Sequence, residues 1–358
     1  MKNQNICQTA VSRYLLSETP QVKVLETYSI IRSLKVFVLL LILSTQPIMA
    51  RQQVGTLDVS ATVNESGGAL VSIPVDVPIG IGGIQPNLSL VYNSQGGYGI
   101  AGWGWNLSGL SSISRVGGTP YYDRYISNIT FDSSDNLMLD GQRLILMSGN
   151  NLQNGAHYHT EVETFSDVTF LSDESGFQID TKDGSTIKYG TSENTRLQST
   201  SVNGGSASSK SVLAWNISYI ADRNGNYMTF LYDVNDTSGE SYIREIDYTG
   251  NGSVEPIHKV VFEYIDMPQE HITYLNGMTF SQTRILKKIK ILTANTKLYE
   301  YELDYEGMAQ SDIHPKLVNV MKIASNGDYF SPITFHWNEP TQSTPSIINI
   351  SHSSDINK

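Results

Sequence analysis

The first group of residues that could do chemistry is a run of glycines. Gly97, Gly99 and Gly102 have the spacing G-x-G-x-x-G, and Asp123 follows about twenty residues later, as in a dinucleotide-binding fingerprint. That fingerprint requires a helix whose N-terminal N–H groups hold a pyrophosphate. The next seven residues, WGWNLSG, are poor helix formers. The sequence therefore predicts no nucleotide cofactor here, and we expect the glycines to form tight turns between closely approaching strands.

A second group could bind a metal ion. On a β-strand, His157, His159 and Glu161 would project from one face, and two histidines with a carboxylate are a known zinc ligand set. An exposed strand face with polar residues explains the same pattern. We favour that interpretation and predict no metal site.

A third group resembles the start of a calcium loop. Asp222, Asn224 and Asn226 occupy the offsets of the first three ligands, but Asp233 stands where a bidentate glutamate is expected. Residues 227–232 between them have the pattern of a strand. The sequence favours a hairpin turn.

The last group resembles the motifs of ADP-ribosyltransferases. Ser199, Thr200 and Ser201 precede Glu300 and Glu302 in the order those enzymes require. However, the serines adjoin a polar segment at 201–210 that is typical of a flexible loop, and both glutamates alternate with apolar residues. We predict exposed positions for these serines and glutamates, and no catalytic site.

The composition favours an all-β fold of many short antiparallel strands and hairpins. The 358 residues include 20 tyrosines and 29 glycines, and strand-length apolar runs are separated by Asp-Gly and Asn-Gly pairs. Hairpins are predicted at 137–147, 177–190 and 215–233, with longer strands at 241–250, 259–266, 283–292, 298–305 and 333–337.

Residues 1–50 read as a leader that contains a secretory signal peptide. Arg32 and Lys35 precede an apolar core at 36–43, and Ala50 is a small residue at the expected cleavage site. Eight apolar residues are too few to span a bilayer, so no membrane span is expected after cleavage. Cys7, the sole cysteine, lies in this leader, which removes disulfides and thiolate metal sites from the exported chain.

The exported chain is acidic. The whole chain has a net charge of −11, and removal of the five basic and two acidic residues of the leader brings this to −14. That sign disfavours a nucleic-acid partner.

The most specific pattern covers residues 67–117. It resembles the N-terminal domain shared by the Salmonella virulence protein SpvB and the B components of insecticidal toxin complexes. That family has a small-residue strand, a proline-bounded strand, and P-x-G-x-G-G with a following proline. A strand ending in Y-N-S, a glycine-rich turn into G-W-x-W or G-x-G-W, and a closing S-I-x-R come next. The matching residues are Pro74, Pro78, Gly80, Gly82, Gly83, Pro86, Tyr92, Asn93, Ser94, Gly102, Trp103, Gly104, Trp105, Ile113 and Arg115.

A looser likeness continues to about residue 340, so the domain is predicted at 51–340, with a polar tail at 341–358. Tyr232-Asp233 is similar to the tyrosine-aspartate pairs of RHS repeats. The resemblance implies a curved, RHS-like β-sheet shell that encloses a toxic polypeptide. It implies as partners the downstream β-propeller and RHS-type shell segments, of the same or a neighbouring polypeptide, and a pore-forming A component.

We therefore predict a secreted, non-enzymatic structural component of a toxin complex or virulence protein. The alternatives are a surface adhesion or carbohydrate-binding β module, and an ADP-ribosyltransferase. A buried pair formed by Trp103 and Trp105, which would share a strand face, favours the shell, whereas an exposed aromatic row favours binding. In an incomplete shell, we expect the strands at 283–292, 298–305 and 333–337 to be open edges, one of them blunted by Lys287, Lys288 and Lys290.

Overall fold

The computed structural model describes residues 52–171, 176–202, 205–309 and 314–338. The chain divides into two units, Met1–Arg51 and Gln52–Lys358, and all described residues belong to the second. The predicted signal peptide, Cys7 and the polar tail lie outside these residues. The all-β prediction is confirmed, because 59% of the structure is strand and 4% is helix. Within the described stretches, no helix has the length and hydrophobicity needed to cross a membrane.

Two-residue turns build several of the hairpins. Asp140-Gly141 joins β9 (Asn136–Leu139) to β10 (Gln142–Ser148), and both turn residues have positive φ, 48° and 84°. Asn276-Gly277 makes the same kind of connection between β19 (His258–Leu275) and β20 (Met278–Thr293). Positive φ at both central residues produces a turn whose twist matches that of the flanking strands. These turns set the register of the long hairpins.

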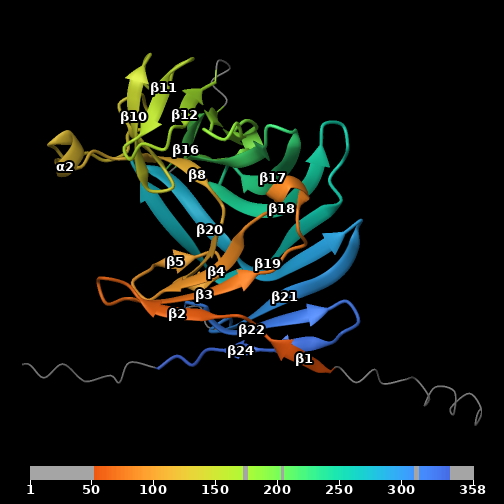
Figure 1. The fold of residues 1–358 in the computed structure, drawn as a ribbon. Helices are drawn as coiled ribbons and strands as arrows, with labels where there is room; N and C mark the ends of the chain where they lie inside the picture. The colour runs from red at the N-terminus through yellow and green to blue at the C-terminus, as the bar shows by residue number, and fades with distance from the viewer. Residues whose placement is uncertain (1–51, 172–175, 203–204, 310–313, 339–358) are drawn as a thin grey trace, which may run out of the picture. The chain divides into compact units, whose positions relative to one another are not determined.

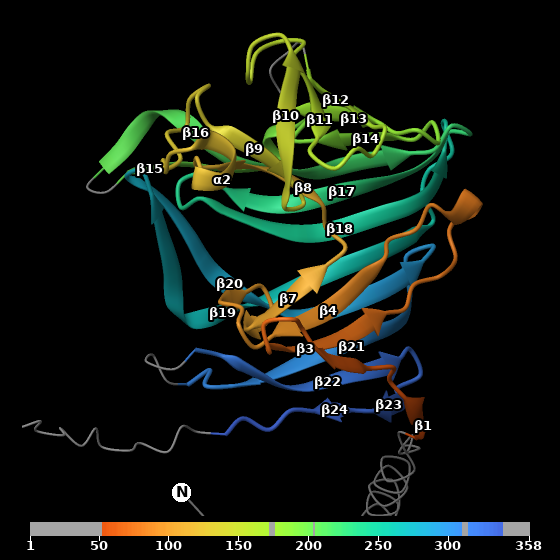
Figure 2. The same ribbon diagram turned by 60° about the vertical axis from the view of Figure 1, so that its left-hand side comes forward.

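Eight strands close into a ring, which we call the first ring. Its labelled strands lie in the upper part of both views (Figures 1 and 2). Pairing runs from β8 through β14 to β16 and back to β8, every pair being antiparallel. The members not yet bounded are β8 (Ser112–Val116), β11 (His157–Thr160), β12 (Asp167–Phe170), β13 (Phe177–Asp180), β14 (Thr186–Tyr189) and β16 (Gly205–Ala221).

A second ring shares β16 with the first. It runs from β15 through β20 and closes where Val202 of β15 pairs with Met278 of β20. Its other members are β15 (Arg196–Val202), β17 (Asn226–Asn235) and β18 (Glu240–Asn251). The prediction of a flexible loop at 201–210 was wrong for the described residues. Ser201 and Val202 of β15 pair with Ser206 and Gly205 of β16.

The sheet continues beyond the second ring and ends at two short strands. β21 (Thr296–Glu306) pairs with β20, and β22 (Lys316–Ala324) pairs with β21. β22 also pairs with β23 (Tyr329–Ser331) and β24 (Ile333–Thr334), and β1 (Gln53–Thr56) adds to β23 in parallel.

The prediction of three open edges was wrong for two of them. β20 and β21 each have a strand on both sides, so among the described strands at this end of the sheet the free edges belong to β1 and β24. Lys287, Lys288 and Lys290 do not blunt an edge, because they pair with carboxylates on the neighbouring strands β19 and β21. The pattern of alternating residues predicts a strand, but it does not predict which strands will lie on either side of it.

A separate four-stranded sheet packs on the strands of the second ring and its extension. Its order is β2–β3–β4–β7, and a small hairpin, β5 with β6, follows β4. In Figure 2 this sheet, drawn in orange, lies in front of β21 and β22. Its inward residues, such as Ile73 and Leu90, are fully buried in the same core as Tyr301 and Leu303 of β21. The bounds are β2 (Ser60–Val63), β3 (Ala69–Val75), β4 (Leu88–Asn93), β5 (Tyr98–Gly99), β6 (Gly102–Trp103) and β7 (Trp105–Ser108).

Candidate functional site

The glycine fingerprint forms a hairpin and not a nucleotide site. Gly99 and Gly102 pair across β5 and β6, and the next element is the strand β7 where the fingerprint requires a helix. A Cβ on Gly99 would lie 2.0 Å from the carbonyl oxygen of Trp105, so glycine is required there by close approach of two backbones. Asp123, the residue that would contact a ribose, instead forms an ion pair with Arg143 at 2.6 Å.

The three residues considered as metal ligands bind different partners. On β11, His157 Nδ1 lies 3.1 Å from Asp167 Oδ1, and His159 Nδ1 lies 3.6 Å from Glu163 Oε2. Glu161 accepts a hydrogen bond from Tyr122. Among the described residues, no group of three histidine, cysteine or acidic side chains is arranged to hold a metal ion.

The calcium-loop pattern forms the turn between β16 and β17. Asp222 Oδ1 accepts hydrogen bonds from the backbone N–H groups of Asn224 and Asn226, at 2.8 and 2.9 Å. Asn226 Nδ2 donates to Asp222 Oδ2 at 2.7 Å. The carboxylate therefore holds the turn closed, as aspartate commonly does in hairpin loops.

The exposed positions predicted for the serines and glutamates were wrong at two residues. Ser199 is completely buried, and its Oγ donates to the carbonyl oxygen of Thr279 at 2.7 Å. Glu300 is only 7% exposed and pairs with Lys297 at 3.0 Å. Their hydrogen bonds and ion pairs offset the free-energy cost of burying these polar groups.

Strand pairing also separates these serines from the glutamates. Ser199 contacts Thr279 of β20, whereas Glu302 pairs with Lys288, nine residues further along that strand. Nine residues of extended strand measure roughly 30 Å. The residues of the transferase-like pattern are therefore not brought to one site.

The segment between Pro74 and Pro78 holds the four-stranded sheet against the main sheet. The backbone N–H of Asp76 donates to Tyr301 Oη at 2.9 Å, and Tyr299 Oη donates to the Asp76 carbonyl at 3.2 Å. Lys322 Nζ donates to Asp76 Oδ2 at 2.7 Å and lies 4.3 Å from the centre of the Tyr299 ring. One short segment thus contacts both β21 and β22.

The prolines and glycines of the signature extend this contact. Tyr248 of β18 donates to the carbonyl of Pro78 at 3.0 Å. Gly82 has a φ of 64°, and a Cβ there would lie 2.7 Å from Asn226 Nδ2, so the 3₁₀ turn η1 (Ile81–Gly83) packs on the Asp222 turn. Gly80 has an even closer neighbour, within its own turn, since its Cβ would lie 2.0 Å from the Ile84 carbonyl oxygen.

The remaining signature residues before the tryptophans fix the ends of the four-stranded sheet. Pro74 lies on β3 beyond the end of β2, so its missing N–H removes no bond to that strand. Pro86 is buried before β4. At the other end of β4, Asn93 N donates to the Gly104 carbonyl at 2.9 Å, and Ser94 Oγ accepts from Ala69 N at 2.9 Å.

Trp103 and Trp105 do not form the predicted buried pair. Gly104 between them has a φ of 73°, which breaks the strand, so they lie on different strands, β6 and β7. Trp105 is 1% exposed and lies 4.8 Å from the ring of Phe335. Trp103 is 39% exposed, and His314 stacks on it at 5.0 Å. Burial of the tryptophans therefore does not separate the shell from a binding module. Trp105 is buried in the core, whereas Trp103 is partly exposed and stacked on a histidine.

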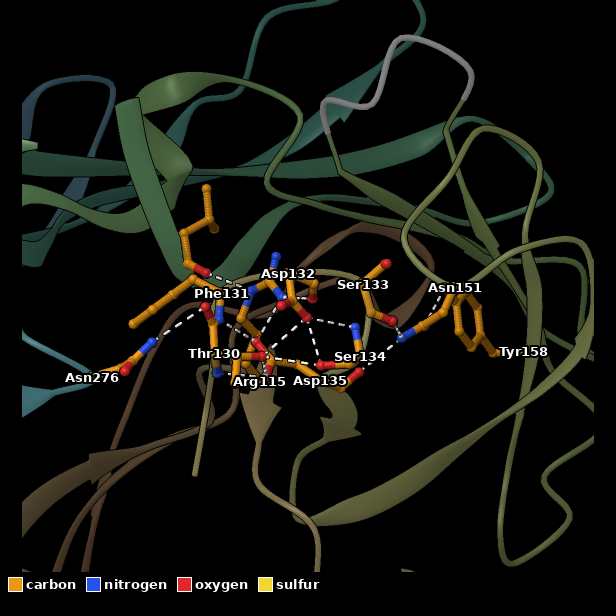
Figure 3. Close-up of polar contacts among 11 residues, drawn as sticks. Arg115, Thr130, Phe131, Asp132, Ser133, Ser134, Asp135, Asn151, Tyr158 and Asn276 are labelled. Atoms are coloured by element: carbon orange, nitrogen blue, oxygen red, sulfur yellow. Dashed lines mark hydrogen bonds and ion pairs between the residues drawn. The ribbon is translucent and has the colours of Figure 1, made fainter. Parts of the chain in front are cut away.

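Arg115 closes the signature and holds a loop of the first ring (Figure 3). Its Nη1 donates to Asp135 Oδ2 at 2.9 Å and to the Asp132 carbonyl at 2.7 Å, while Nε donates to the Val212 carbonyl at 2.8 Å. Asp135 is 3% exposed and also accepts from the backbone N–H groups of Thr130 and Phe131. Burial lowers the pKa of Arg115, an effect that Asp135 opposes. The pair is a buried structural anchor.

Sequence reasoning missed the partners of these residues. Asp76 lies inside the signature, where an acidic residue between two prolines was a signal that could have been followed. Asp135 and Lys322 are separated from their partners by 20 and 246 residues, and no local pattern indicates those pairs.

The described part of the chain thus defines a class of protein: an all-β domain whose distinctive residues hold sheets together. The chain belongs to the family of the Salmonella virulence plasmid 65kDa B protein, SpvB, whose model matches residues 63–333. No match was found among curated protein sequences.

Solved structures share this fold. The crystal structure of TcdB2-TccC3 is 16% identical over 81% of this chain, with a TM-score of 0.64, and the Photorhabdus luminescens Tc holotoxin pore gives the same identity, coverage of this chain and TM-score. The chain spans only 17% and 16% of those two chains. The N-terminal domain of the effector SpvB from Salmonella typhimurium is 16% identical over 71% of this chain and 98% of its own length, with a TM-score of 0.56.

Proposed function

We propose that this chain is a secreted structural component of a bacterial toxin complex, and that it supplies part of the wall of a β-sheet shell that encloses and delivers a toxic polypeptide. The partners are the β-propeller and RHS-type segments that complete the shell, with a pore-forming component as the docking target. The leader predicted at 1–50 from the order of charged, apolar and small residues supports export.

The observation that carries this proposal is the open end of the main sheet. β1 pairs only with β23, and β24 pairs only with β22, among the strands that the structure describes. A strand edge presents unpaired N–H and C=O groups that another strand can bind. Since the chain spans 17% of the TcdB2-TccC3 chain that shares its fold, a continuing segment fits this end of the sheet.

We also propose that the domain has no catalytic activity of its own. The arrangement of the signature residues supports this, since Asp76, Arg115 and the glycines contact backbone or core side chains across the sheets. The separation of Ser199 from Glu302 further argues against the transferase alternative.

We expect the chain without its partners to self-associate at micromolar concentration, because β1 offers a free edge with no charged side chain. Sedimentation velocity across a concentration series measures this. The matched control is Val54→Lys, which places a charge on an edge residue that is already 52% exposed and should shift the sedimentation toward the monomer. A wild-type monomer at every concentration would argue for an independent binding module.

A further inference from the structure

The first ring is packed at one end and hollow at the other. Tyr158, Phe170, Phe177 and Trp215 fill the packed end, each at most 4% exposed, with neighbouring ring centres 4.9 to 6.4 Å apart. The interior of an eight-stranded ring is just wide enough either to be filled by side chains or to hold one small ligand. Aromatic side chains close only part of this interior.

The hollow end begins one inward-facing residue beyond that aromatic cluster. Thr160, Ile179 and Ile217, each two residues after Tyr158, Phe177 and Trp215, line a cavity of about 390 Å³. That volume lies within the range of small-molecule sites, roughly 300 to 1,000 Å³.

The cavity has an apolar floor. Ile179 and Ile217, which are 2% and 3% exposed, line this floor. Phe230 and Met228 of β17, which are 3% and 6% exposed, line it as well. These side chains offer carbon contacts and no strong hydrogen-bonding group. The floor therefore suits the apolar body of a ligand.

One side of the cavity carries a connected set of polar groups. Ser111 Oγ donates to Asp140 Oδ2 at 2.6 Å and lies 2.8 Å from Tyr189 Oη, and all three residues line the cavity. Burial raises the pKa of Tyr189 to about 12, so its hydroxyl stays protonated at neutral pH. Because Ser111 donates its hydrogen to Asp140, Tyr189 donates to Ser111, and the Tyr189 oxygen stays free to accept a hydrogen bond. The carboxylate of Asp140 repels an anion, so the polar groups suit an uncharged hydrogen-bond donor.

We propose that the hollow end of the first ring binds one small, uncharged, largely apolar molecule that carries a single hydrogen-bond donor, such as a hydroxyl or an N–H group. Its apolar body contacts Ile179, Ile217 and Phe230, and its polar group binds beside Ser111 and Tyr189. This ligand site is additional to the structural role proposed above and does not depend on it.

The test uses N-phenyl-1-naphthylamine, an uncharged apolar fluorophore, with the full chain. We expect saturable fluorescence enhancement with one site per chain. Ile220→Trp adds volume from a half-buried wall residue into the cavity and should weaken binding at least tenfold while the melting temperature holds or rises. Ile145→Trp, on an exposed residue outside the lining, is the matched control and should leave binding unchanged.

Charge provides a second arm. The anionic fluorophore 8-anilinonaphthalene-1-sulfonate should bind at least tenfold more weakly than the uncharged probe. Asp140→Asn should reduce that difference, since asparagine tolerates the positive φ of 48° at this turn position.

Absence of uncharged-probe binding to the folded wild type would overturn the proposal, as would binding that Ile220→Trp leaves unchanged. Should Ile220→Trp lower the melting temperature, Leu139→Trp fills the cavity from a lining residue on another strand, β9. Unchanged probe affinity in a folded Leu139→Trp variant would likewise overturn it.

Discussion

Arg115→Ala should destabilise the domain by about 3 to 5 kcal/mol, because it leaves the buried carboxylate of Asp135 without its charged partner. The Arg115 side chain is 10% exposed and that of Asp135 is 2% exposed, so water cannot replace the lost bonds easily. The midpoint of urea-induced unfolding measures the effect.

The matched control for that variant is Arg244→Ala. Arg244 also pairs with an aspartate, Asp233, but at 3.4 Å and with 49% of its side chain exposed. An exposed pair of this kind contributes about 0 to 1 kcal/mol. Equal losses in the two variants would show that Arg115 is not an anchor of the first ring.

Gly99→Val should destabilise the domain by about 3 kcal/mol or more, because its side chain would collide with backbone. The Cβ alone would lie 2.0 Å from the carbonyl oxygen of Trp105, and backbone cannot turn aside as a flexible side chain can. Thermal and urea unfolding of the purified variant measure the loss.

Two further glycines separate the causes. Gly83 has a φ of 84° but open space around it, so Gly83→Val should cost only the left-handed strain of about 1 to 2 kcal/mol. Gly97 has open space and no positive φ, so Gly97→Val should have little effect. A flat response across the three positions would contradict the close-approach explanation.

Local features of the fold could be predicted from the sequence. The hairpin at Asp140-Gly141 follows from two residues that tolerate positive φ, flanked by alternating strands. The Asp222 turn follows for a similar reason, since the aspartate side chain binds the backbone of its own turn.

Non-local features could not be predicted. β16 pairs with β14 and β15 and also with β8 and β17, and strand alternation does not say which strands will share an edge. Ser199 was predicted to be exposed because it adjoins the polar segment at 201–210, yet a hydrogen bond to Thr279, 80 residues away, allows its burial. Trp103 and Trp105 were expected on one face because alternate residues of a continuous strand share a face. The positive φ of Gly104 interrupts the strand and separates them.

Hydrogen exchange at the sheet edges tests the shell-wall proposal most directly. The wild-type chain is compared alone, at a concentration at which sedimentation shows a monomer, and in complex with the adjacent RHS-type segment. We predict that outward-facing amides of β1 and β24 exchange fast in the free chain and slowly in the complex, while β20 and β21, paired on both sides, stay protected in both. Failure to form a complex, or a complex with unchanged exchange at β1 and β24, would contradict the proposal that this sheet continues into a larger shell.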